Sequence, residues 1–428
     1  MTMFLIAFVI FFILLFAGVP IAFSMGLGSL IGLMADGSAN LSVVAQRLFS
    51  GVNSFSLMAI PFFMLSGELM LKGGISRRLV DFAHSLIGHL TGGLGMVDIL
   101  TSVIFAGISG SAAADTAAVG SIMIEPMKDR GYPGGLAAVI QATAGSLGPI
   151  IPPSLTMIIY CSLTNLSIGE CFMAGVLPGL VIGIGCLLIT YFYAKKLGIK
   201  GERRATGKEI WEATKKAALA LVMPLIIIGG IVGGIFTATE AGAIAVLYAL
   251  VVGMFVFKEF TWKDLPKIFV DAAASSAMCL LIVAAANVFS WLVAYAKIPT
   301  IIVNFLVSMT DNKYIIMILL VIFLLIVGMF IETLSATIIV APILMPVAAQ
   351  YGIDPVQFAL VMVITLVYAG VTPPVGGVLF ITMGIAKVKM KETLKYLPPY
   401  LGVVCISLLL LIFFPKISLF LPHLLFKG

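Results

Sequence analysis

Charge is scarce in this sequence. Only 10% of the 428 residues are charged, 61% are hydrophobic, and the mean hydropathy is +1.19. Soluble domains average about 25% charged residues, so a water-exposed chain of this length would lack the charge to cover its surface. The composition therefore excludes a soluble enzyme, a nucleic-acid-binding protein and a disordered chain. It indicates a polytopic membrane protein embedded in a lipid bilayer.

Groups that perform metal, redox or nucleotide chemistry are also few. The five cysteines show no paired spacing, and the three histidines do not share metal-ligand spacing. The sequence has no G-x-x-x-x-G-K-[ST] motif and no polar block large enough for a nucleotide-binding domain, so we expect no ATPase and, alkali ions aside, no metal centre. We also expect no enzyme. The alternative class is a membrane-embedded hydrolase or transferase, which would need an unrepeated Ser-His-Asp type of constellation.

Apolar runs, by contrast, follow one another from residue 3 to residue 422. Because a spanning helix needs about 20 apolar residues, we expect an all-α polytopic protein with about 11 transmembrane helices. The first run, 3–17, has no charged segment before it and no small-residue cleavage site, so it predicts a spanning helix and not a removed signal. Two later runs contain proline pairs, in GPIIPPS at 148–154 and GVTPPVGG at 370–377, and such pairs interrupt a helix.

The chain repeats itself at a fixed spacing. Three landmarks recur 220 or 221 positions apart: Pro126 with Pro346, Pro152 with Pro373, and Ser111 with Glu332. When crossings are counted from the basic loop at 126–133, 20 of the 25 Lys and Arg residues fall on its side of the membrane, which is therefore cytoplasmic. Both termini and the partner loop at 346–355 then lie on the opposite face. The two repeats are predicted to be inverted, as in many secondary transporters.

The duplication divides the chain into two predicted repeats, 1–215 and 216–428. The first is expected to contain scaffold helices within 1–72, an interfacial helix at 74–91, a hairpin at 94–127, a broken helix at 134–165, a helix at 172–194 and a basic cytoplasmic loop at 195–216. The second is expected to contain scaffold helices within 217–296, an interfacial segment at 297–312, a hairpin at 313–350, a broken helix at 356–386 and a last helix at 398–422.

Each half places a short polar turn between two apolar runs, GISGSAAAD at 107–115 and GMFIETLSAT at 328–337. Such a pair fits a re-entrant hairpin whose tip faces the unwound Pro-Pro backbone, where carbonyls and hydroxyls offer the hard oxygen ligands that suit Na⁺. The predicted ligands are Ser109, Ser111, Gly148, Ile151 and Pro153 for a first Na⁺ site, and Gly328, Thr333, Thr372 and Val375 for a second. The alternative is that these small residues only let helices pack closely.

Charged and polar side chains near these breaks are candidates for substrate contacts or for a gate. Intramembrane carboxylates are costly, so Glu332 at the second tip and Asp115, a turn beyond the first, are the main candidates. Arg47 and Asn53 precede the third apolar run and could face an anionic substrate or a docking partner, although a solvated rim explains them equally well. Glu240 is expected to cap a helix.

Two long stretches resemble signatures of one known family. The stretch SGSAAADTAAVGSIMIEPMKDRGYPGGLAAVIQATAGSLGPIIPPS (109–154) is similar to the first signature of the large membrane subunit of tripartite ATP-independent periplasmic (TRAP) transporters. The stretch ETLSATIIVAPILMPVAAQYGIDPVQFALVMVITLVYAGVTPPVGGVLF (332–380) is similar to the second. The resemblance covers essentially the whole chain. It implies a Na⁺-driven, elevator-type importer in the bacterial inner membrane, and the Lys and Arg count then predicts both termini on the periplasmic side.

The resemblance also implies partners and ion ligands. By the family pattern, Ser109, Ser111, Gly148 and Pro153 would serve the first Na⁺ site, and Gly328 and Thr372 the second. The family commonly has an aspartate where this chain has Glu332, which leaves ligand, gate and helix cap open for that residue. The implied partners are a small four-helix membrane subunit, expected as a separate chain because this one begins with the first large-subunit helix, and a periplasmic binding protein.

The substrates that the resemblance implies are organic acids, among them C4-dicarboxylates, sialic acid and sugar acids. No selectivity motif is readable in the sequence, and the overall resemblance slightly favours sialic acid. Within the transporter class, a dicarboxylate or citrate carrier that works without a binding protein is the alternative.

Overall fold

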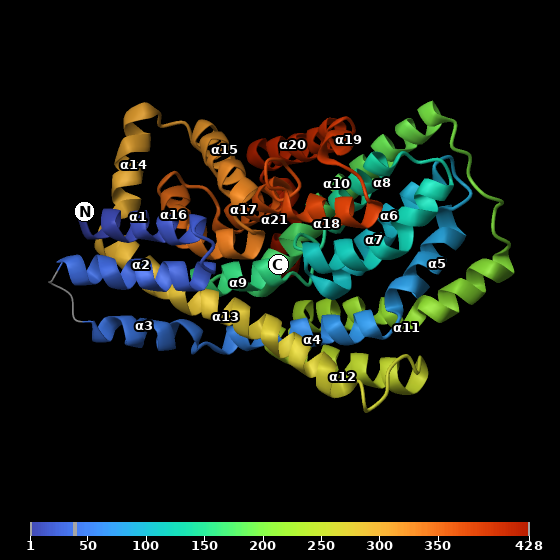
Figure 1. Ribbon diagram of the computed structural model, residues 1–428, viewed down its shortest axis with the longest axis horizontal. Helices are drawn as coiled ribbons and strands as arrows, with labels where there is room; N and C mark the ends of the chain where they lie inside the picture. The colour runs from blue at the N-terminus through green and yellow to red at the C-terminus, as the bar shows by residue number, and fades with distance from the viewer. Residues whose placement is uncertain (1, 37–40, 427–428) are drawn as a thin grey trace.

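The computed structural model describes residues 2–36 and 41–426, and within them it is helical throughout, with no β-strand (Figure 1). The first half contains α1 (Thr2–Phe16), α2 (Ile21–Asp36), α3 (Ser42–Val52), α4 (Ala59–Lys72), α5 (Ile75–Ile87), α6 (Gly93–Ser109), α7 (Ala112–Asp129), α8 (Gly134–Gly145), α9 (Leu155–Thr164) and α10 (Ile168–Leu197). A short 3₁₀ turn, η1 (Phe55–Met58), precedes α4.

The second half contains α11 (Gly207–Val232), α12 (Ala238–Val251), α13 (Leu265–Tyr295), α14 (Ile298–Met309), α15 (Lys313–Phe330), α16 (Thr333–Gln350), α17 (Pro355–Ala369), α18 (Gly377–Ala386), α19 (Met390–Leu394), α20 (Leu397–Phe413) and α21 (Lys416–Phe426). A turn of π-helix, η2 (Val252–Val256), extends α12. In the described ranges, seven helices are long and apolar enough to cross a membrane, and several shorter apolar helices accompany them. The protein is therefore a multi-pass membrane protein.

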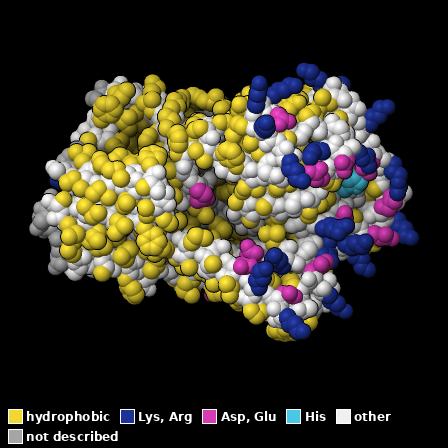
Figure 2. All heavy atoms as spheres, viewed as in Figure 1, with side chains coloured by type: hydrophobic (Ala, Val, Ile, Leu, Met, Phe, Trp, Pro, Cys, Tyr) yellow, Lys and Arg dark blue, Asp and Glu magenta, His cyan; other side chains and the backbone are white. Residues whose placement is uncertain are grey.

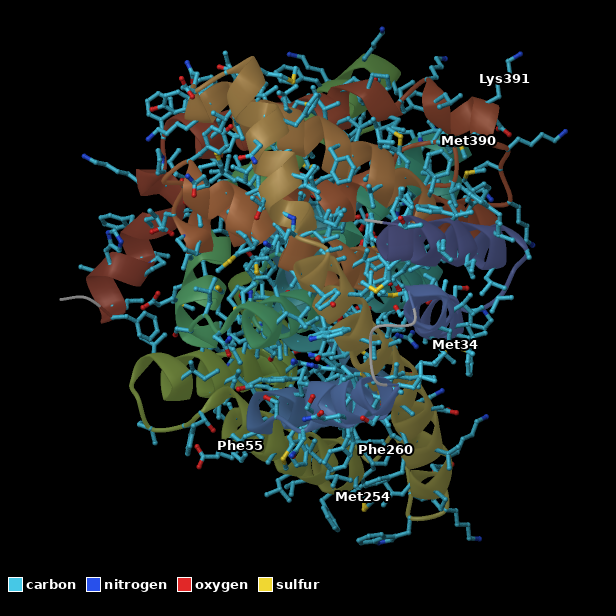
Figure 3. All side chains as sticks on the ribbon, turned by 90° about the vertical axis from the view of Figure 1, so that its left-hand side faces the viewer. Met34, Phe55, Met254, Phe260, Met390 and Lys391 are labelled. Carbon is cyan, nitrogen blue, oxygen red and sulfur yellow. The ribbon has the colours of Figure 1, made fainter. Side chains whose placement is uncertain are left out.

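Charged side chains are concentrated at one end of the face shown in Figure 2. Lys, Arg, Asp and Glu side chains gather on the right of the face shown in Figure 2, whereas hydrophobic side chains cover most of the left. Hydrophobic side chains also fill the interior between the helices (Figure 3), where the largest fully buried ones include Tyr160, Tyr368 and Tyr400. An apolar exterior of this extent is what lipid-facing helices require.

The helices form two packed groups. In one, α13 lies against α2, α3 and α4, while α4 also packs on α12. In the other, helices from both halves interleave, because α18 packs on α7 and α8, and α16 packs on α9. Each half thus contributes a hairpin (α6–α7 and α15–α16) followed by a helix broken at its proline pair (α8–α9 and α17–α18) to one shared unit.

The chain enters and leaves the first half of this unit at one place. The segment after α10 runs back along the segment before α6, where the Gly92 N–H donates to the Ile199 carbonyl (3.3 Å) and the Glu202 N–H donates to the Gly88 carbonyl (3.1 Å). Glu202 also forms an ion pair with Arg130 in the loop after α7 (2.6 Å). The two connections are therefore joined directly to each other.

Two predicted elements are wrong in their extent. The expected basic loop at 195–216 is partly helical, because Thr206 and Glu209 form a capping box that begins α11 at Gly207. The expected last helix at 398–422 is two helices, α20 and α21, bent by 61°. Pro415 lies at this bend, where a proline removes a backbone donor and stops the preceding helix. By contrast, the capping role expected for Glu240 is confirmed by its capping box with Thr237.

Candidate functional site

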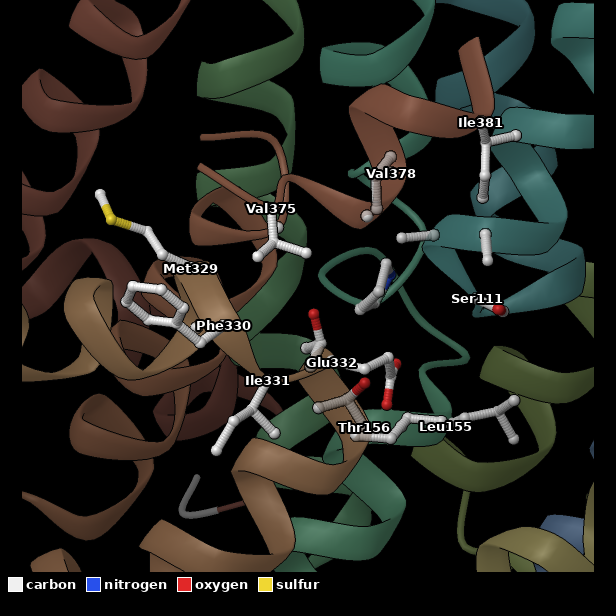
Figure 4. Close-up of a pocket in the computed structure, with 18 of the residues that line it drawn as sticks. Ser111, Leu155, Thr156, Met329, Phe330, Ile331, Glu332, Val375, Val378 and Ile381 are labelled. Carbon is white, nitrogen blue, oxygen red and sulfur yellow. The ribbon is translucent and has the colours of Figure 1, made fainter. Parts of the chain in front are cut away.

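A cavity of about 480 Å³ lies where the two hairpin tips meet the two broken helices. Ser111 and Pro149 line it from the first half, and Glu332 and Val375 line it from the second. Figure 4 shows Glu332 between Val375 and Thr156 of α9. Glu332 is the only charged side chain among the described residues that line this cavity.

The first hairpin tip touches the first Pro-Pro segment. The turn between α6 and α7 is made by Gly110, whose φ of 64° is left-handed and favours glycine. A Cβ at Gly110 would lie 2.4 Å from the Pro153 carbonyl oxygen, so a larger residue could not approach so closely. The Leu155 N–H, at the start of α9, also donates to the Gly110 carbonyl (3.4 Å). The tip and the broken helix are thus in direct contact.

Asp115 lies behind this tip and not on the cavity wall. Its carboxylate accepts a hydrogen bond from the Ser109 hydroxyl through Oδ1, while its buried Oδ2 has no partner. A Cβ on Gly148 would lie 2.3 Å from that Oδ2 and 3.1 Å from the Ser111 carbonyl carbon. The structure therefore groups Asp115 with the predicted first-site residues Ser109, Ser111 and Gly148. A role of Asp115 as a substrate contact or gate stays a prediction.

This cluster suits a small hard cation. An unpaired carboxylate oxygen that is shielded from water is costly, and a bound cation offsets that cost. Gln141 holds the start of α7 in place, because its Nε2 donates to the Asp115 and Thr116 carbonyls (3.3 and 3.4 Å). Gln141 was not among the predicted site residues, although an amide within the apolar run 134–165 was a usable signal.

The remaining predicted first-site residues lie on the broken helix. Pro153 faces the tip through its carbonyl, as described above, whereas the Ile151 side chain packs on Gly179 of α10. The peptide bond between the two prolines is cis here and in the second Pro-Pro segment. Ser154 closes the segment by donating to the Pro149 carbonyl (2.5 Å) and capping α9.

The second tip is built around a helix cap. Glu332 is the N-cap of α16, and its Oε2 accepts from the Ser335 N–H (3.2 Å) and hydroxyl (3.4 Å). Thr333 donates from Oγ1 to the Leu366 carbonyl near the end of α17 (3.5 Å). A Cβ on Gly328 would lie 2.6 Å from the Ala369 Cβ, so this tip also rests on its broken helix.

The other predicted second-site residues follow on the same broken helix. The Thr372 hydroxyl donates to the Tyr368 carbonyl (2.8 Å), and Val375 lines the cavity. Leu15 and Ile21, which flank the turn between α1 and α2, line it as well. These two apolar residues were not predicted, and nothing in their local pattern distinguishes them from other lipid-facing positions.

Two predicted substrate contacts lie elsewhere. Arg47 is exposed on α3, and Asn53 follows the end of that helix, where its N–H donates to the Phe49 carbonyl (3.1 Å). Neither lines the cavity. Their helix packs on α13. A contact of either residue with substrate or with a docking partner stays a prediction.

Two hairpin tips that meet across a cavity inside a bundle of apolar helices define a class, the multi-pass membrane proteins that handle a solute at mid-membrane. Comparison with protein families identifies the family within this class. The family described as "Tripartite ATP-independent periplasmic transporter, DctM component" matches residues 8–417. The chain belongs to this family, and its resemblance to TRAP large subunits is confirmed.

Relatives with named substrates agree with this assignment. The chain is 37% identical to the sialic acid TRAP transporter large permease protein of Vibrio cholerae, covering 97% of each chain. It is also 37% identical to the C4-dicarboxylate TRAP transporter large permease protein of Rhodobacter capsulatus, covering 98% of this chain and 99% of that one. Both relatives are named as transporter permeases and not as enzymes.

A solved structure shares the fold. The YdaH transporter of Alcanivorax borkumensis superposes with a TM-score of 0.61 over 90% of this chain and 89% of that one, at 14% sequence identity. At this identity the likeness concerns the arrangement of helices alone.

Proposed function

We propose that this chain is the large membrane subunit of a transporter that imports an organic acid across the bacterial inner membrane together with Na⁺. The observation that carries the proposal is the unpartnered Asp115 Oδ2, which lies beside Gly148 at the first hairpin tip. The second predicted ion site, formed by Gly328, Thr333, Thr372 and Val375, has no carboxylate of its own, and Glu332 stands next to it.

Charge balance supports the coupling of ion and substrate. The cavity is lined by one carboxylate and, among the described residues, by no cation, so an organic acid entering it would meet net negative charge. Na⁺ bound at the tips would offset this negative charge before the acid binds. The tips and broken helices would then move together as one elevator-type unit against the scaffold helices.

The remaining parts of the proposal concern partners and substrate. As the tripartite family name suggests, the chain would work with a small four-helix membrane subunit and a periplasmic binding protein that delivers the acid. We expect sialic acid or a C4-dicarboxylate, because relatives named for each cover nearly the whole chain. Both termini would lie on the periplasmic side.

Proteoliposomes test this function. The chain would be reconstituted with the small subunit and binding protein encoded in its gene neighbourhood, after a thermal-shift screen of that binding protein has identified the acid. Uptake should require an inward Na⁺ gradient and be unaffected by ATP. Equal uptake in Na⁺-free K⁺ buffer would contradict Na⁺ coupling. Uptake that persists without the binding protein would favour the carrier that needs none.

A further inference from the structure

Two of the three tryptophans are exposed on the scaffold helices. Trp211, near the start of α11, is 69% exposed, and Trp262, just before α13, is 71% exposed. The third, Trp291, is half-buried and stacks on Tyr295 with ring centroids 5.2 Å apart. Exposed indoles at the ends of apolar helices are typical of the membrane–water interface.

The two exposed indoles lie at the same end of the scaffold. A short connection, 233–237, joins α11 to α12, and the two helices pack against each other, so the end of α12 returns to the beginning of α11. Trp262 follows soon after the end of α12, and in Figure 1 α11 begins at the right edge while the connection from α12 to α13 lies at the lower right.

Lysines surround these indoles without protein partners. Lys208 and Lys215 are three and four positions from Trp211 and share its face of α11, and Lys263 and Lys267 are four positions apart at the start of α13. The residues of this tryptophan–lysine surface are all exposed: Trp211, Trp262, Lys208, Lys215, Lys263 and Lys267. In the described part of the chain, none of the four lysines forms an ion pair.

Three of the five acidic residues in segments 203–216 and 258–271 are already engaged. Glu209 pairs with Arg203, and Glu259 pairs with Arg78 (2.8 Å). Hydrogen bonds from the Thr261 backbone N–H and hydroxyl lower the pKa of Asp264, so this carboxylate stays ionised and bound to its own turn. The other two, Glu212 and Asp271, are exposed and form no ion pair in the described chain. The two segments carry eight basic residues against these five acidic ones, so a net charge of +3 remains at this end of the scaffold.

Beyond the indoles the same helices present apolar side chains outward. Leu225 on α11 is 69% exposed and Val270 on α13 is 65% exposed. From the end inward, each helix thus presents a zone of mixed ammonium groups and indoles and then aliphatic side chains. This succession matches the headgroup region and the hydrocarbon of one leaflet.

We propose that the tryptophan–lysine surface binds the headgroups of anionic phospholipids in the cytoplasmic leaflet. Charge complementarity carries this choice of occupant, because unbalanced lysines attract a headgroup with net negative charge and gain nothing from a zwitterionic one. The indoles would lie at headgroup level beside them. Lipid held here would keep the scaffold at a constant depth while the hairpin unit moves.

Tryptophan fluorescence tests the proposal on the full chain assembled with its small subunit. The Trp291→Phe variant leaves emission from the two surface indoles, with any tryptophans of the small subunit replaced by phenylalanine. Vesicles would contain the same mole fraction of brominated phosphatidylglycerol or brominated phosphatidylcholine. We expect quenching by the phosphatidylglycerol to be about twofold stronger, because the anionic lipid is enriched at the surface. Equal quenching by the two lipids would overturn the proposal.

Lysine variants test whether the charge of this surface causes the lipid preference. Changing Lys208, Lys215, Lys263 and Lys267 to Gln should remove the preference while quenching by brominated phosphatidylcholine remains. The same change at Lys195, Lys196, Lys387 and Lys391, on other elements, should leave the preference intact. Added inorganic phosphate should not compete. Indoles that neither lipid quenches in the assembled complex would show that a protein partner covers the surface, and would also overturn the proposal.

Discussion

The Glu332 side chain has two roles, which depend on different properties of its carboxylate. Its Oε2 caps α16 through the Ser335 N–H, and its carboxylate is also the charged group on the described cavity wall. A cap needs only an acceptor oxygen, whereas charge balance in the cavity needs the negative charge itself. The two roles can therefore be separated by a substitution that keeps the oxygen and removes the charge.

Glu332→Gln performs this separation. The amide oxygen can still accept from Ser335, so the chain should insert, assemble and melt as before. We expect the initial rate of substrate uptake in proteoliposomes to fall at least about tenfold, equivalent to about 1.4 kcal/mol. Ser335→Ala, which removes a hydroxyl donor but keeps the charge, is the matched control and should retain most activity. Uptake by Glu332→Gln within about twofold of the wild type would reduce this residue to a helix cap.

Asp115→Asn should change the ion dependence of transport. The change keeps an acceptor for the Ser109 hydroxyl but removes the charge beside Gly148. We expect the Na⁺ concentration for half-maximal uptake to rise at least about fivefold, the effect of losing about 1 kcal/mol of ion binding. Asp98→Asn is the control, because Asp98 is also fully buried with unpartnered carboxylate oxygens but lies near the start of α6, whereas the tip follows the end of that helix. An unchanged Na⁺ response in Asp115→Asn would remove the carboxylate from the proposed ion site.

For single residues, the sequence predicted which side chains lie near the hairpin tips. It did not predict which of them line the cavity and which lie behind the tip. Polar residues in apolar runs marked Ser109, Ser111 and Glu332 because burying them without a purpose is unfavourable. The placement of Asp115 behind the tip depends on the left-handed turn at Gly110, which swings α7 back along α6. The spacing of residues along the sequence does not predict that turn.

Hairpins and broken helices were the elements easiest to predict. Paired prolines interrupt a helix by their own covalent structure, whatever surrounds them, so the breaks near Pro152 and Pro373 were visible in the sequence. The ends of helices that depend on packing against other helices could not be predicted from the sequence. The helix α3, which packs on α13, has too short an apolar pattern to stand out, and the single Pro415 gave no hint of a 61° bend.

The short helix α5 is expected to depend on one arginine for its attachment to the scaffold. Arg78 pairs with Glu259 (2.8 Å), donates to the Gly74 carbonyl (2.9 Å) and stands over the Phe257 ring at 3.9 Å. Arg78→Gln should lower the free energy of unfolding by about 1–2 kcal/mol, since a partly exposed ion pair and a cation–π contact are lost together. Thermal unfolding in detergent should show a lower Tm. Arg77→Gln, at an exposed neighbouring position without an ion pair in the described chain, should leave the Tm unchanged.

As a whole, the molecule leaves a broad aromatic surface on its first two helices. Phe8 and Phe16 of α1 and Phe23 of α2 are exposed, while the two helices pack on each other and α2 packs on α13. The inverted relation of the two repeats and the count of about 11 crossings remain predictions at this scale. Contact between this chain and the small subunit is also still a prediction.

Co-purification tests that neighbour. A partner that binds only the folded chain stabilises it by about 2.7 kcal/mol at a free concentration near 100 times its Kd. The chain purified with the small subunit should therefore melt several degrees higher than the chain alone in the same detergent. Matching melting curves would argue that the two do not form a stable complex.

The contact between the Gly88–Gly92 segment and the Ile199–Glu202 segment has a consequence for where the polypeptide chain can be cut. Residues 93–197 begin and end at neighbouring points, so this stretch forms a closed loop whose return path is held by hydrogen bonds within residues 1–204. Downstream, α11 packs on α5, and α18 packs on α7 and α8. The peptide bond after Arg204 therefore joins two parts of the chain that are also held together by helix packing. The protein should tolerate division there, and fragments 1–204 and 205–428 produced as separate polypeptides should insert and reassemble into the same bundle.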